Sequence, residues 1–235
     1  MSLVFIISAP SGSGKSTLVN EIRISVPHLE FSISYTTRKP RGSEQNGREY
    51  YYIEREEFEA MIHRDAFLEH AEVFGNYYGT ARRFLAEAEV RGHDLLLDID
   101  VQGASQLQKK LPDAISIFIL PPTKQELEKR LRRRSTIDQV PNEVIEKRLM
   151  TASLEIENYG KYDYILVNDA LEDSIERLRA IILSERNHVS GHNAQTPEEQ
   201  RVAELANECL LENMRARIQS ILKTFRDPGS SAATN

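Results

Sequence analysis

A glycine-rich loop between an apolar run and a helical segment constrains this chain more than any other feature. The loop, Ser8 to Thr17 (SAPSGSGKST), follows the apolar run Leu3 to Ile7 and opens a segment with helical spacing. This order matches the pattern G-x-x-x-x-G-K-[ST], except that Ala9 replaces the first glycine. In such a loop backbone N–H groups and a helix N-terminus hold phosphates, Lys15 would reach the outer phosphates, and the Ser16 hydroxyl would ligate Mg²⁺. A Gly/Ser turn that caps an ordinary helix is the structural alternative, but the coincidence of strand, loop and helix favours a nucleoside triphosphate site.

Alternating strand and helix patterns predict an α/β fold. Four short apolar runs are typical of strands buried on both faces: Leu3 to Ile7, Asp94 to Ile99, Ile115 to Leu120 and Tyr164 to Val167. Each precedes a segment with helical spacing: Lys15 to Val26, Val101 to Leu111, Thr123 to Arg134 and Leu171 to Glu185. This alternation predicts a parallel sheet with right-handed crossovers and helices on both faces. Ligands of such sheets bind at the carboxyl ends of the strands.

The stretch Glu30 to Gly79 departs from this alternation. It is rich in Tyr, Thr, Arg and Gly and has only short alternating runs, such as Phe31 to Tyr35. We interpret it as an inserted small β-rich lobe, with a short helix at Glu54 to His63.

The C-terminal part predicts a linker and a helix. The linker covers 189–197, and Thr196-Pro197 supplies an N-cap and a proline at the first helical position. Apolar residues then recur on one face of a long amphipathic helix over 198–226. This face needs a cover, either the chain's own core, which is the commoner case, or a second chain in a homo-oligomer. We expect the tail, 227–235, to be disordered.

Composition excludes several classes of protein. A chain of 235 residues with 40% hydrophobic residues can bury a substantial core, which excludes disorder throughout. The chain has 30 Lys and Arg against 36 Asp and Glu. Its net charge is therefore negative, the wrong sign for a protein that coats nucleic acid, and we expect no nucleic-acid partner.

The single cysteine, Cys209, excludes an intramolecular disulfide framework and fits a reducing compartment. Because no apolar run approaches a bilayer-spanning length and the N-terminus has no basic region, we expect a cytoplasmic protein without a membrane partner.

Two carboxylates end the second apolar run. Asp98 and Asp100 have period-two spacing, which directs both side chains to the same side of the strand. They would hold Mg²⁺ through water or accept a ligand's hydrogen bonds. Asp100 is also a good N-cap for a helix beginning at Val101, and the sequence does not separate the two roles.

The inserted lobe narrows the choice of function. A glycine-rich loop alone leaves a GTPase, an ATPase motor and a small-molecule kinase open. The run Thr36 to Gly42 (TTRKPRG) and the tyrosines Tyr50 to Tyr52 supply guanidiniums and phenols, the groups that grip a second phosphate. Glu69 and the run Asn76 to Thr80 add a carboxylate and hydroxyls.

With these motifs the sequence resembles the guanylate kinase family of ATP:GMP phosphotransferases. The resemblance runs from about Leu3 to Glu185 and rests on five motifs: APSGSGKS at Ala9 to Ser16, TTRKPR at Thr36 to Arg41, GNYYG at Gly75 to Gly79, LDID at Leu97 to Asp100 and ILVND at Ile165 to Asp169. Family members carry either Ala or Gly at the position of Ala9. The resemblance implies a P-loop NTPase core (1–33 and 81–188), a mobile GMP-binding lobe (about 34–80) and a helical lid (about 130–155).

The resemblance also implies the reaction and the residues that serve it. GMP and ATP would become GDP and ADP with Mg²⁺, in purine nucleotide metabolism and GMP recycling. The residues implied for ATP are Ala9, Pro10, Ser11, Gly12, Ser13, Gly14, Lys15, Ser16, Thr17, Arg130, Arg134 and Asn168. Those implied for the GMP phosphate are Arg38, Arg41, Tyr50 and Tyr78, those for guanine are Ser34, Glu69, Thr80 and Asp100, and the substrate-binding set also includes Glu44, Gly79 and Asp98. Lys15, Arg38, Arg134 and Arg148 would act in catalysis, and Ser16 and Asp98 would hold the metal.

The chemistry of guanine supports the role of Glu69 independently. Guanine presents an N1–H and an exocyclic N2 amine side by side, which one ionised carboxylate accepts with both oxygens, whereas adenine has an acceptor at N1. A buried Glu69 facing adenine would lose its partner, a mismatch that gives large discrimination. For an isolated glutamate, a solvated carboxylate near a strand is the alternative.

A basic cluster would neutralise the transferred phosphoryl group. Two anionic nucleotides repel each other, and because the GMP phosphate oxygen is already ionised, positioning and cations matter more than a general base. The cluster consists of Arg130, Arg132, Arg133, Arg134 and Arg148. An exposed basic helix end explains it equally well, and a nucleic-acid patch is a weaker third explanation. Arg133 and Ser135 replace glycines usual in the family's lid, which puts lid flexibility in doubt.

Two other functions compete with a GMP kinase. One is a related P-loop kinase for another phosphorylated acceptor, which the presence of both Glu69 and Asp100 opposes. The other is a guanylate-kinase-like module that binds phosphopeptides without catalysis. Such modules typically degrade the nucleotide loop, whereas Gly14, Lys15 and Ser16 are all present here.

Overall fold

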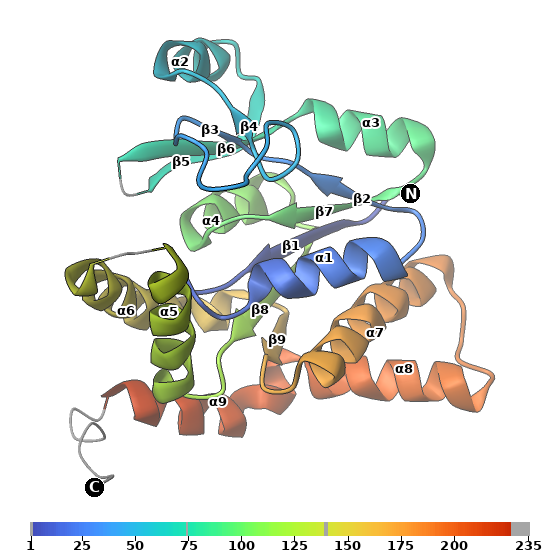
Figure 1. Ribbon diagram of the computed structural model, residues 1–235. Coiled ribbons are helices and arrows are strands. Elements are labelled where there is room, and N and C mark those ends of the chain that lie inside the picture. Colours follow the sequence, from blue (N-terminus) through green and yellow to red (C-terminus); the bar gives the residue numbers. More distant parts are fainter. Residues whose placement is uncertain (1, 74, 139–140, 227–235) are drawn as a thin grey trace, which may run out of the picture. The chain divides into compact units, whose positions relative to one another are not determined.

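The computed structural model describes residues 2–73, 75–138 and 141–226, apart from the side chains of 134–138. The chain divides into two compact units, shown with their helices and strands in Figure 1. Unit 1 comprises Met1–Ile7 and Ser25–Ser116, and unit 2 comprises Ser8–Ile24 and Ile117–Asn235. The tail predicted over 227–235 lies outside the described residues.

Three parallel strands form one layer of unit 1. β7 (Asp94–Asp98) pairs with β1 (Val4–Ser8) on one side and with β2 (Leu29–Ser32) on the other. All of β1 and all of β7 except its last residue are buried, as expected for strands covered on both faces. The turn after β7 leads directly into α4 (Val101–Lys110).

A small mixed sheet in unit 1 corresponds to the β-rich lobe expected from the sequence. Its strands are ordered β4 (Tyr51–Tyr52), β3 (Tyr35–Thr36), β6 (Asn76–Ala81) and β5 (Phe67–Val73). β3 and β4 are parallel, whereas β6 is antiparallel to both β3 and β5. The helices that accompany these strands are α2 (Arg55–His63) and α3 (Arg83–Arg91). Phe58 and Met61 of α2 share an apolar core with Phe67 and Ala81 of the sheet.

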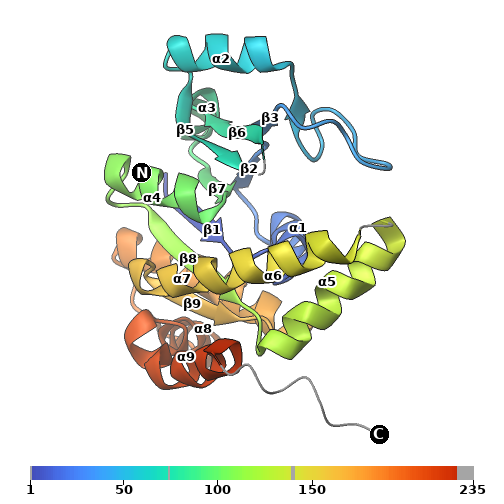
Figure 2. The ribbon, with the colours of Figure 1, turned by 90° about the vertical axis from the view of Figure 1, so that its left-hand side faces the viewer.

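Unit 2 contains a buried pair of parallel strands and most of the helices. β8 (Ile115–Leu120) pairs with β9 (Tyr164–Val167), and every residue of both strands is buried. The helices before and between these strands are α1 (Lys15–Ser25), α5 (Lys124–Asp138), α6 (Asn142–Ile156) and the short 3₁₀ helix η1 (Glu157–Lys161). α5 and α6 lie side by side, as Figure 2 shows, and share an apolar cluster of Leu127, Leu131, Ile145, Leu149 and Ala152.

The α/β class and the strand-then-helix order predicted from the sequence are confirmed. β8 and β9 have the predicted bounds, and β1, β7, α1 and α4 differ by one residue at their ends. α7 (Leu171–Ser190) continues five residues beyond the predicted end at Glu185, because its polar residues remain helical until Gly191 adopts a left-handed conformation with φ 70°. Among the described residues, no helix combines the length and the apolar composition that a membrane crossing requires.

The single long helix predicted over 198–226 is wrong. The segment forms two helices, α8 (Pro197–Glu208) and α9 (Leu211–Arg226), because the backbone between them pairs with β9. Ile165 N–H donates to the Cys209 carbonyl at 2.7 Å, and Leu211 N–H donates to the Asp163 carbonyl at 2.9 Å. The apolar face, which includes Ala206, Cys209, Met214, Ile218, Ile221 and Leu222, is buried within the chain's own unit. Of the two covers expected from the sequence, the chain's own core is therefore the one observed.

Loss of the hydroxyl that caps α8 should lower stability without affecting activity. Thr196 Oγ1 accepts a hydrogen bond from Glu199 N–H at 3.2 Å, and the Glu199 carboxylate accepts one from Thr196 N–H at 3.0 Å. We expect Thr196→Ala to lower the free energy of unfolding in urea by about 1 kcal/mol and Thr196→Ser to keep it. An unchanged urea midpoint in Thr196→Ala would show that this cap does not support the helix.

Candidate functional site

The residues predicted to form the site fall into two sets, one in each unit. Unit 2 contains the glycine-rich loop with Arg130, Arg134, Arg148 and Asn168. Unit 1 contains the lobe residues with Asp98 and Asp100.

The glycine-rich loop adopts a conformation that requires its glycines. Gly12 and Gly14 have φ of 92° and 88°, in the left-handed region that disfavours other residues. A side chain at Gly14 would also collide with the Asn168 amide, and one at Gly12 would come within 2.8 Å of Leu131. The loop is thus a bare backbone turn directly before α1, the context that a phosphate site requires.

Two predicted nucleotide contacts converge on this loop. Asn168 lies directly after β9 and donates from Nδ2 to the Ser13 carbonyl at 2.7 Å. Arg130 of α5 approaches the same carbonyl with Nη1 at 3.4 Å and pairs with Glu126 at 2.9 Å. The structure therefore brings Asn168, Arg130 and the loop together, although they are far apart in the sequence.

The start of α1 presents groups suited to an anion. Lys15 is half-buried, Ser16 and Thr17 are exposed, and the first turn carries no acidic residue. Ser13 Oγ is buried and has no hydrogen-bond partner in the described part of the chain. A helix N-terminus, an ammonium and a buried hydroxyl available for a ligand together fit a phosphate chain.

The other arginines of the predicted basic cluster, on α5 and α6, have different surroundings. Arg132 pairs with Glu128 on its own helix and with Glu146 on α6, so its charge links the two helices. Arg148 on α6 is half-buried, and the side chain of Arg134 lies outside the described residues. The backbone of α5 is helical at both Arg133 and Ser135, the two positions singled out above because the resemblance led us to expect glycine there.

Arg38 in unit 1 has a nearly buried guanidinium that is fixed by an ion pair. Its side chain is 9% exposed and forms a two-pronged ion pair with Glu44, with N–O distances of 2.9 and 3.1 Å. Burial alone would lower the pKa of Arg38, but the hydrogen bonds and charge of Glu44 outweigh it and raise the pKa. Burial likewise opposes ionisation of Glu44, whose pKa is nevertheless lowered by hydrogen bonds from Arg38, Arg41 N–H and the Tyr52 hydroxyl. Arg38 is therefore a permanent cation in a fixed position.

Aromatic rings surround this guanidinium. Arg38 lies 5.3 Å from the centre of the Tyr50 ring, and the Tyr50 and Tyr78 rings are 5.7 Å apart. Burial, with the Asp98 carboxylate as a smaller cause, raises the pKa of Tyr50, so its phenol stays a hydrogen-bond donor. Arg41, in contrast, is exposed. Arg38, Tyr50 and Tyr78, three of the four residues that the resemblance implies for the GMP phosphate, are thus neighbours, and Asp98 is close enough to influence Tyr50.

Glu69 is a carboxylate buried to 3% exposure on β5. In the register of the sheet it faces Thr80 on β6, which is itself fully buried. Burial raises the pKa of Glu69 to about 7, neighbouring Thr80 opposes the rise, and the Asp100 carboxylate adds to it. The residues predicted for guanine therefore cluster in unit 1, and the solvated carboxylate considered above is excluded for Glu69.

Gly79 and Ser34 are buried next to this cluster. A Cβ at Gly79 would come within 2.9 Å of both Phe58 and Phe67, so only glycine fits there. Ser34 is 9% exposed, and its carbonyl accepts a hydrogen bond from Tyr51 N–H at 2.9 Å. Both predicted residues thus belong to the packed interior of the lobe.

Asp100 acts as a helix cap, as the sequence analysis anticipated. Its Oδ1 accepts a hydrogen bond from Gly103 N–H at 2.8 Å, at the first turn of α4. Asp98 is half-buried at the end of β7. Because capping uses one oxygen of Asp100, a second role in binding a ligand stays compatible with the structure.

Three residues of α4 that the sequence analysis missed hold Glu69 in place. A Cβ at Gly103 would overlap the Glu69 carboxylate, so the glycine provides the space that Glu69 occupies. Gln106 donates to the His70 carbonyl at 2.8 Å and Lys110 donates to the Leu68 carbonyl at 2.6 Å, which fixes the backbone on both sides of Glu69. A glycine inside a predicted helix usually has a packing reason, and that signal was available in the sequence.

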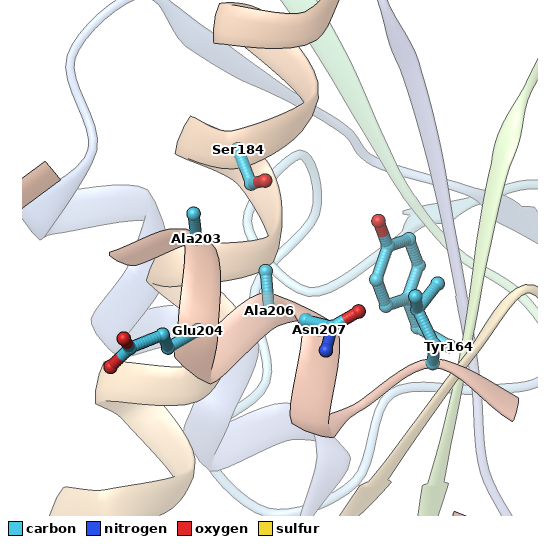
Figure 3. Close-up of a pocket in the computed structure, with 7 residues that line it drawn as sticks. Tyr164, Ser184, Ala203, Glu204, Ala206 and Asn207 are labelled. Carbon is cyan, nitrogen blue, oxygen red and sulfur yellow. The ribbon is translucent and has the colours of Figure 1, made fainter. Parts of the chain in front are cut away.

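A separate cavity lies between β9, α7 and α8. It measures 440 Å³ and is lined by Tyr164, Ser184, Ala203, Glu204, Ala206, Asn207 and Leu210 (Figure 3). None of these is a predicted site residue, and the Tyr164 hydroxyl donates to Glu185 at 2.5 Å. Among the described residues, no group of three or more His, Cys, Asp or Glu side chains is arranged to hold a metal ion.

Comparison with known proteins gives consistent matches. The model of the guanylate kinase family matches residues 1–185. The chain is 62% identical over 225 residues to the guanylate kinase of Koribacter versatilis (strain Ellin345), a match that covers 95% of this chain and 96% of the relative. It is 49% identical over 189 residues to the guanylate kinase of Escherichia coli O157:H7, covering 80% of this chain and 90% of the relative. The crystal structure of guanylate kinase from Anaplasma phagocytophilum matches with a TM-score of 0.64 at 34% identity, covering 78% of this chain and 86% of that chain.

The buried Glu69 carboxyl should make stability depend on pH. Its pKa of about 7 exceeds the ordinary value of 4.5, so the folded protein retains a proton that the unfolded chain has released between these pH values. The resulting stabilisation is complete below pH 4.5 and is lost as the pH rises through about 7, a loss of about 3 kcal/mol.

Urea unfolding from pH 4.5 to 8 tests this dependence. Relative to Glu69→Gln, the wild-type protein should lose about 3 kcal/mol over this range. Glu72→Gln, the same change at an exposed position of the same strand, should behave as wild type. Parallel curves for wild type and Glu69→Gln would contradict the burial of an ionisable group.

Proposed function

Because the chain belongs to the guanylate kinase family and phosphorylates GMP to GDP with ATP as the donor, we propose that unit 1 binds GMP and that the glycine-rich loop of unit 2 binds ATP. The observation that carries the first assignment is the buried Glu69 carboxylate. The second rests on the conformation of the loop and its contacts with Asn168 and Arg130.

Glu69 selects the base in this proposal. The guanine N1–H and N2 amine are adjacent donors, and an ionised carboxylate accepts from both. Because Glu69 is removed from water, an adenine acceptor facing it would leave the carboxylate unpaired, which costs far more than at an exposed site. Ser34, Thr80 and Asp100 contribute further polar groups to the guanine site.

Arg38 and the tyrosines bind the phosphate of GMP. Arg38 remains charged, and its ion pair with Glu44 holds the guanidinium before substrate arrives. The hydroxyls of Tyr50 and Tyr78 donate hydrogen bonds to this phosphate, and exposed Arg41 adds a second cation. Such charge-assisted hydrogen bonds are stronger than neutral ones and fix the orientation of the phosphate.

Phosphoryl transfer in this protein requires positioning and positive charge more than proton transfer. The attacking oxygen of GMP is ionised near neutral pH, so no side chain has to act as a general base. Lys15 binds the outer phosphates of ATP, and Arg130, Arg134 and Arg148 offset the charge that develops on the transferred group. Asn168 contacts the adenine from its position after β9.

Each unit offers one oxygen donor proposed for Mg²⁺, the Ser16 hydroxyl in unit 2 and the Asp98 carboxylate in unit 1. Ser16 is exposed and Asp98 is half-buried at a strand end, and each by itself is a hard oxygen ligand of the kind that Mg²⁺ prefers. When bound, Mg²⁺ supplies charge neutralisation on the phosphates. We also propose a cytoplasmic location, supported by the single cysteine, Cys209, which is free.

A phosphopeptide-binding module without catalysis is the rival from another class. Such a module has no use for a loop with left-handed glycines and a lysine at the start of a helix. A related kinase for a different phosphorylated acceptor has no use for a buried carboxylate aligned with Thr80. We therefore favour a GMP kinase that uses the site residues named above. In this proposal the GMP-binding lobe covers about 34–80 and the lid about 130–155.

A panel of acceptors tests the proposal. With Mg²⁺ and ATP, we expect the wild-type protein to phosphorylate GMP and to leave AMP, UMP and dTMP nearly unreacted. Glu69→Gln should raise the KM for GMP about 10- to 100-fold, because a hydrogen bond to a charged group contributes about 1.5–3 kcal/mol. The KM for ATP should stay within about twofold, since Glu69 lies in the unit assigned to GMP.

Glu72→Gln is the matched control and should keep wild-type values for both substrates, because Glu72 is exposed on the same strand. Efficient turnover of AMP without turnover of GMP would refute the proposed function. An equal rise in both KM values for Glu69→Gln would refute the role of Glu69 in choosing the base.

A further inference from the structure

The family match ends at residue 185, and helices α8 and α9 lie beyond it. The Koribacter relative covers 95% of this chain, so it shares most of this extension. The apolar face of α9 is buried within unit 2, so the helix covers part of the core of this unit. Its last turn also contacts α5, which points to a second role.

The end of α9 caps the beginning of α5. Lys124, the first residue of α5, donates its N–H to Thr224 Oγ1 at 3.0 Å, and the Thr224 hydroxyl donates to the Ile221 carbonyl at 2.7 Å. The first N–H groups of a helix have no partner within the helix and need acceptors from elsewhere. A second cap is local, since Thr123 Oγ1 accepts from Glu126 N–H at 3.1 Å. One of the two caps of α5 thus comes from a residue 100 positions away.

Phe225 adds apolar packing at the same point. Its half-buried ring packs against the cluster that α5 and α6 share, which includes Leu127 and Leu131. Both views of the ribbon show the end of α9 next to the start of α5 (Figures 1 and 2). Thr224 and Phe225 therefore fix both the backbone and the apolar face of α5.

Another part of α5 contacts the glycine-rich loop. A methyl group at Gly12 would lie 2.8 Å from Leu131 and 3.1 Å from Leu127, so these leucines pack directly on the loop. Arg130, which directly precedes Leu131 in α5, directs its guanidinium at the Ser13 carbonyl. The two leucines that touch the loop are the same ones that belong to the cluster against which Phe225 packs.

We propose that α9 positions α5 against the glycine-rich loop, with Thr224 and Phe225 as positioning residues for the ATP site. They act through α5, by holding Leu127, Leu131 and Arg130 at the distances from the loop given above. The inference rests on the proposed assignment of ATP to this loop. It gives the C-terminal extension a role in binding the phosphoryl donor in addition to covering the core.

A merely structural role is the alternative, and a matched pair of cap removals separates the two. Thr224→Val removes the hydroxyl that caps α5 with little change of shape, and Thr196→Ala removes the corresponding hydroxyl of α8. Both should lower the midpoint of urea unfolding by a similar amount. Only the first cap belongs to the helix that touches the glycine-rich loop.

The experiment measures the KM for ATP, the KM for GMP and the Kd for Mg²⁺-ATP by calorimetry, using full-length protein. Thr224→Val should raise the KM and Kd for ATP about fivefold, which corresponds to about 1 kcal/mol, and leave the KM for GMP unchanged. Thr224→Ser should restore wild-type values, and Thr196→Ala should lose stability with no change in ATP affinity. Phe225→Leu, which keeps the Thr224 hydroxyl, should also raise the KM and Kd for ATP. This variant decides the question if Thr224→Val does not fold.

Three results would overturn the inference. The first is a Thr224→Val protein that is destabilised as much as Thr196→Ala but binds ATP as wild type does. The second is an equal rise in the KM values for ATP and GMP. The third is a wild-type protein that does not bind ATP, which would refute the proposed ATP site at the glycine-rich loop as well as the positioning role. Normal ATP binding by both wild type and Thr224→Val would refute the positioning role and leave the proposed ATP site intact.

Discussion

Removing the Glu69 carboxylate from water costs free energy, and several features of unit 1 are arranged around it. Burial raises its pKa to about 7, so near neutral pH the group is only partly ionised. Gly103 provides the space for it, and Gln106 and Lys110 hold the carbonyls of the residues on either side. A structure that only had to be stable would gain by replacing this carboxylate, which fits the role in base recognition that we propose for it.

The glycine-rich loop in unit 2 depends on a different kind of support. Its backbone is held by the Asn168 amide and Arg130, and its glycines make room for side chains of α5. α5 is in turn capped and packed at its start by the last turn of α9. The catalytic charges of a kinase must be held within a fraction of an ångström of their working positions, and in the role that we propose for α9 these packed contacts supply part of that rigidity.

Local sequence signals predicted the strands, the glycine-rich loop, the capping role of Asp100 and the candidate role of Glu69. These features are visible because each depends on residues close together in the sequence, or on a carboxylate whose chemistry is distinctive. The break between α8 and α9 was missed because the apolar periodicity continues through Cys209 and Leu210, with no Gly or Pro to signal an end. Hydrogen bonds to β9 impose that break, and they join residues more than 40 positions apart. Gln106 and Lys110, which bond to residues 36 and 42 positions away, and the Thr224 cap, 100 positions from its helix, were missed for the same reason.

The most direct test of the account is the pKa of the Glu69 carboxyl itself, followed by carbon-detected NMR during a pH titration of the free protein and of the protein saturated with GMP. In the free protein the pKa should be about 7. Saturation with GMP should lower it, because the two N–H donors of guanine stabilise the ionised carboxylate, whereas the same concentration of AMP should not. A pKa that is unchanged or raised in the GMP complex would show that Glu69 does not accept hydrogen bonds from guanine, and would contradict the central claim.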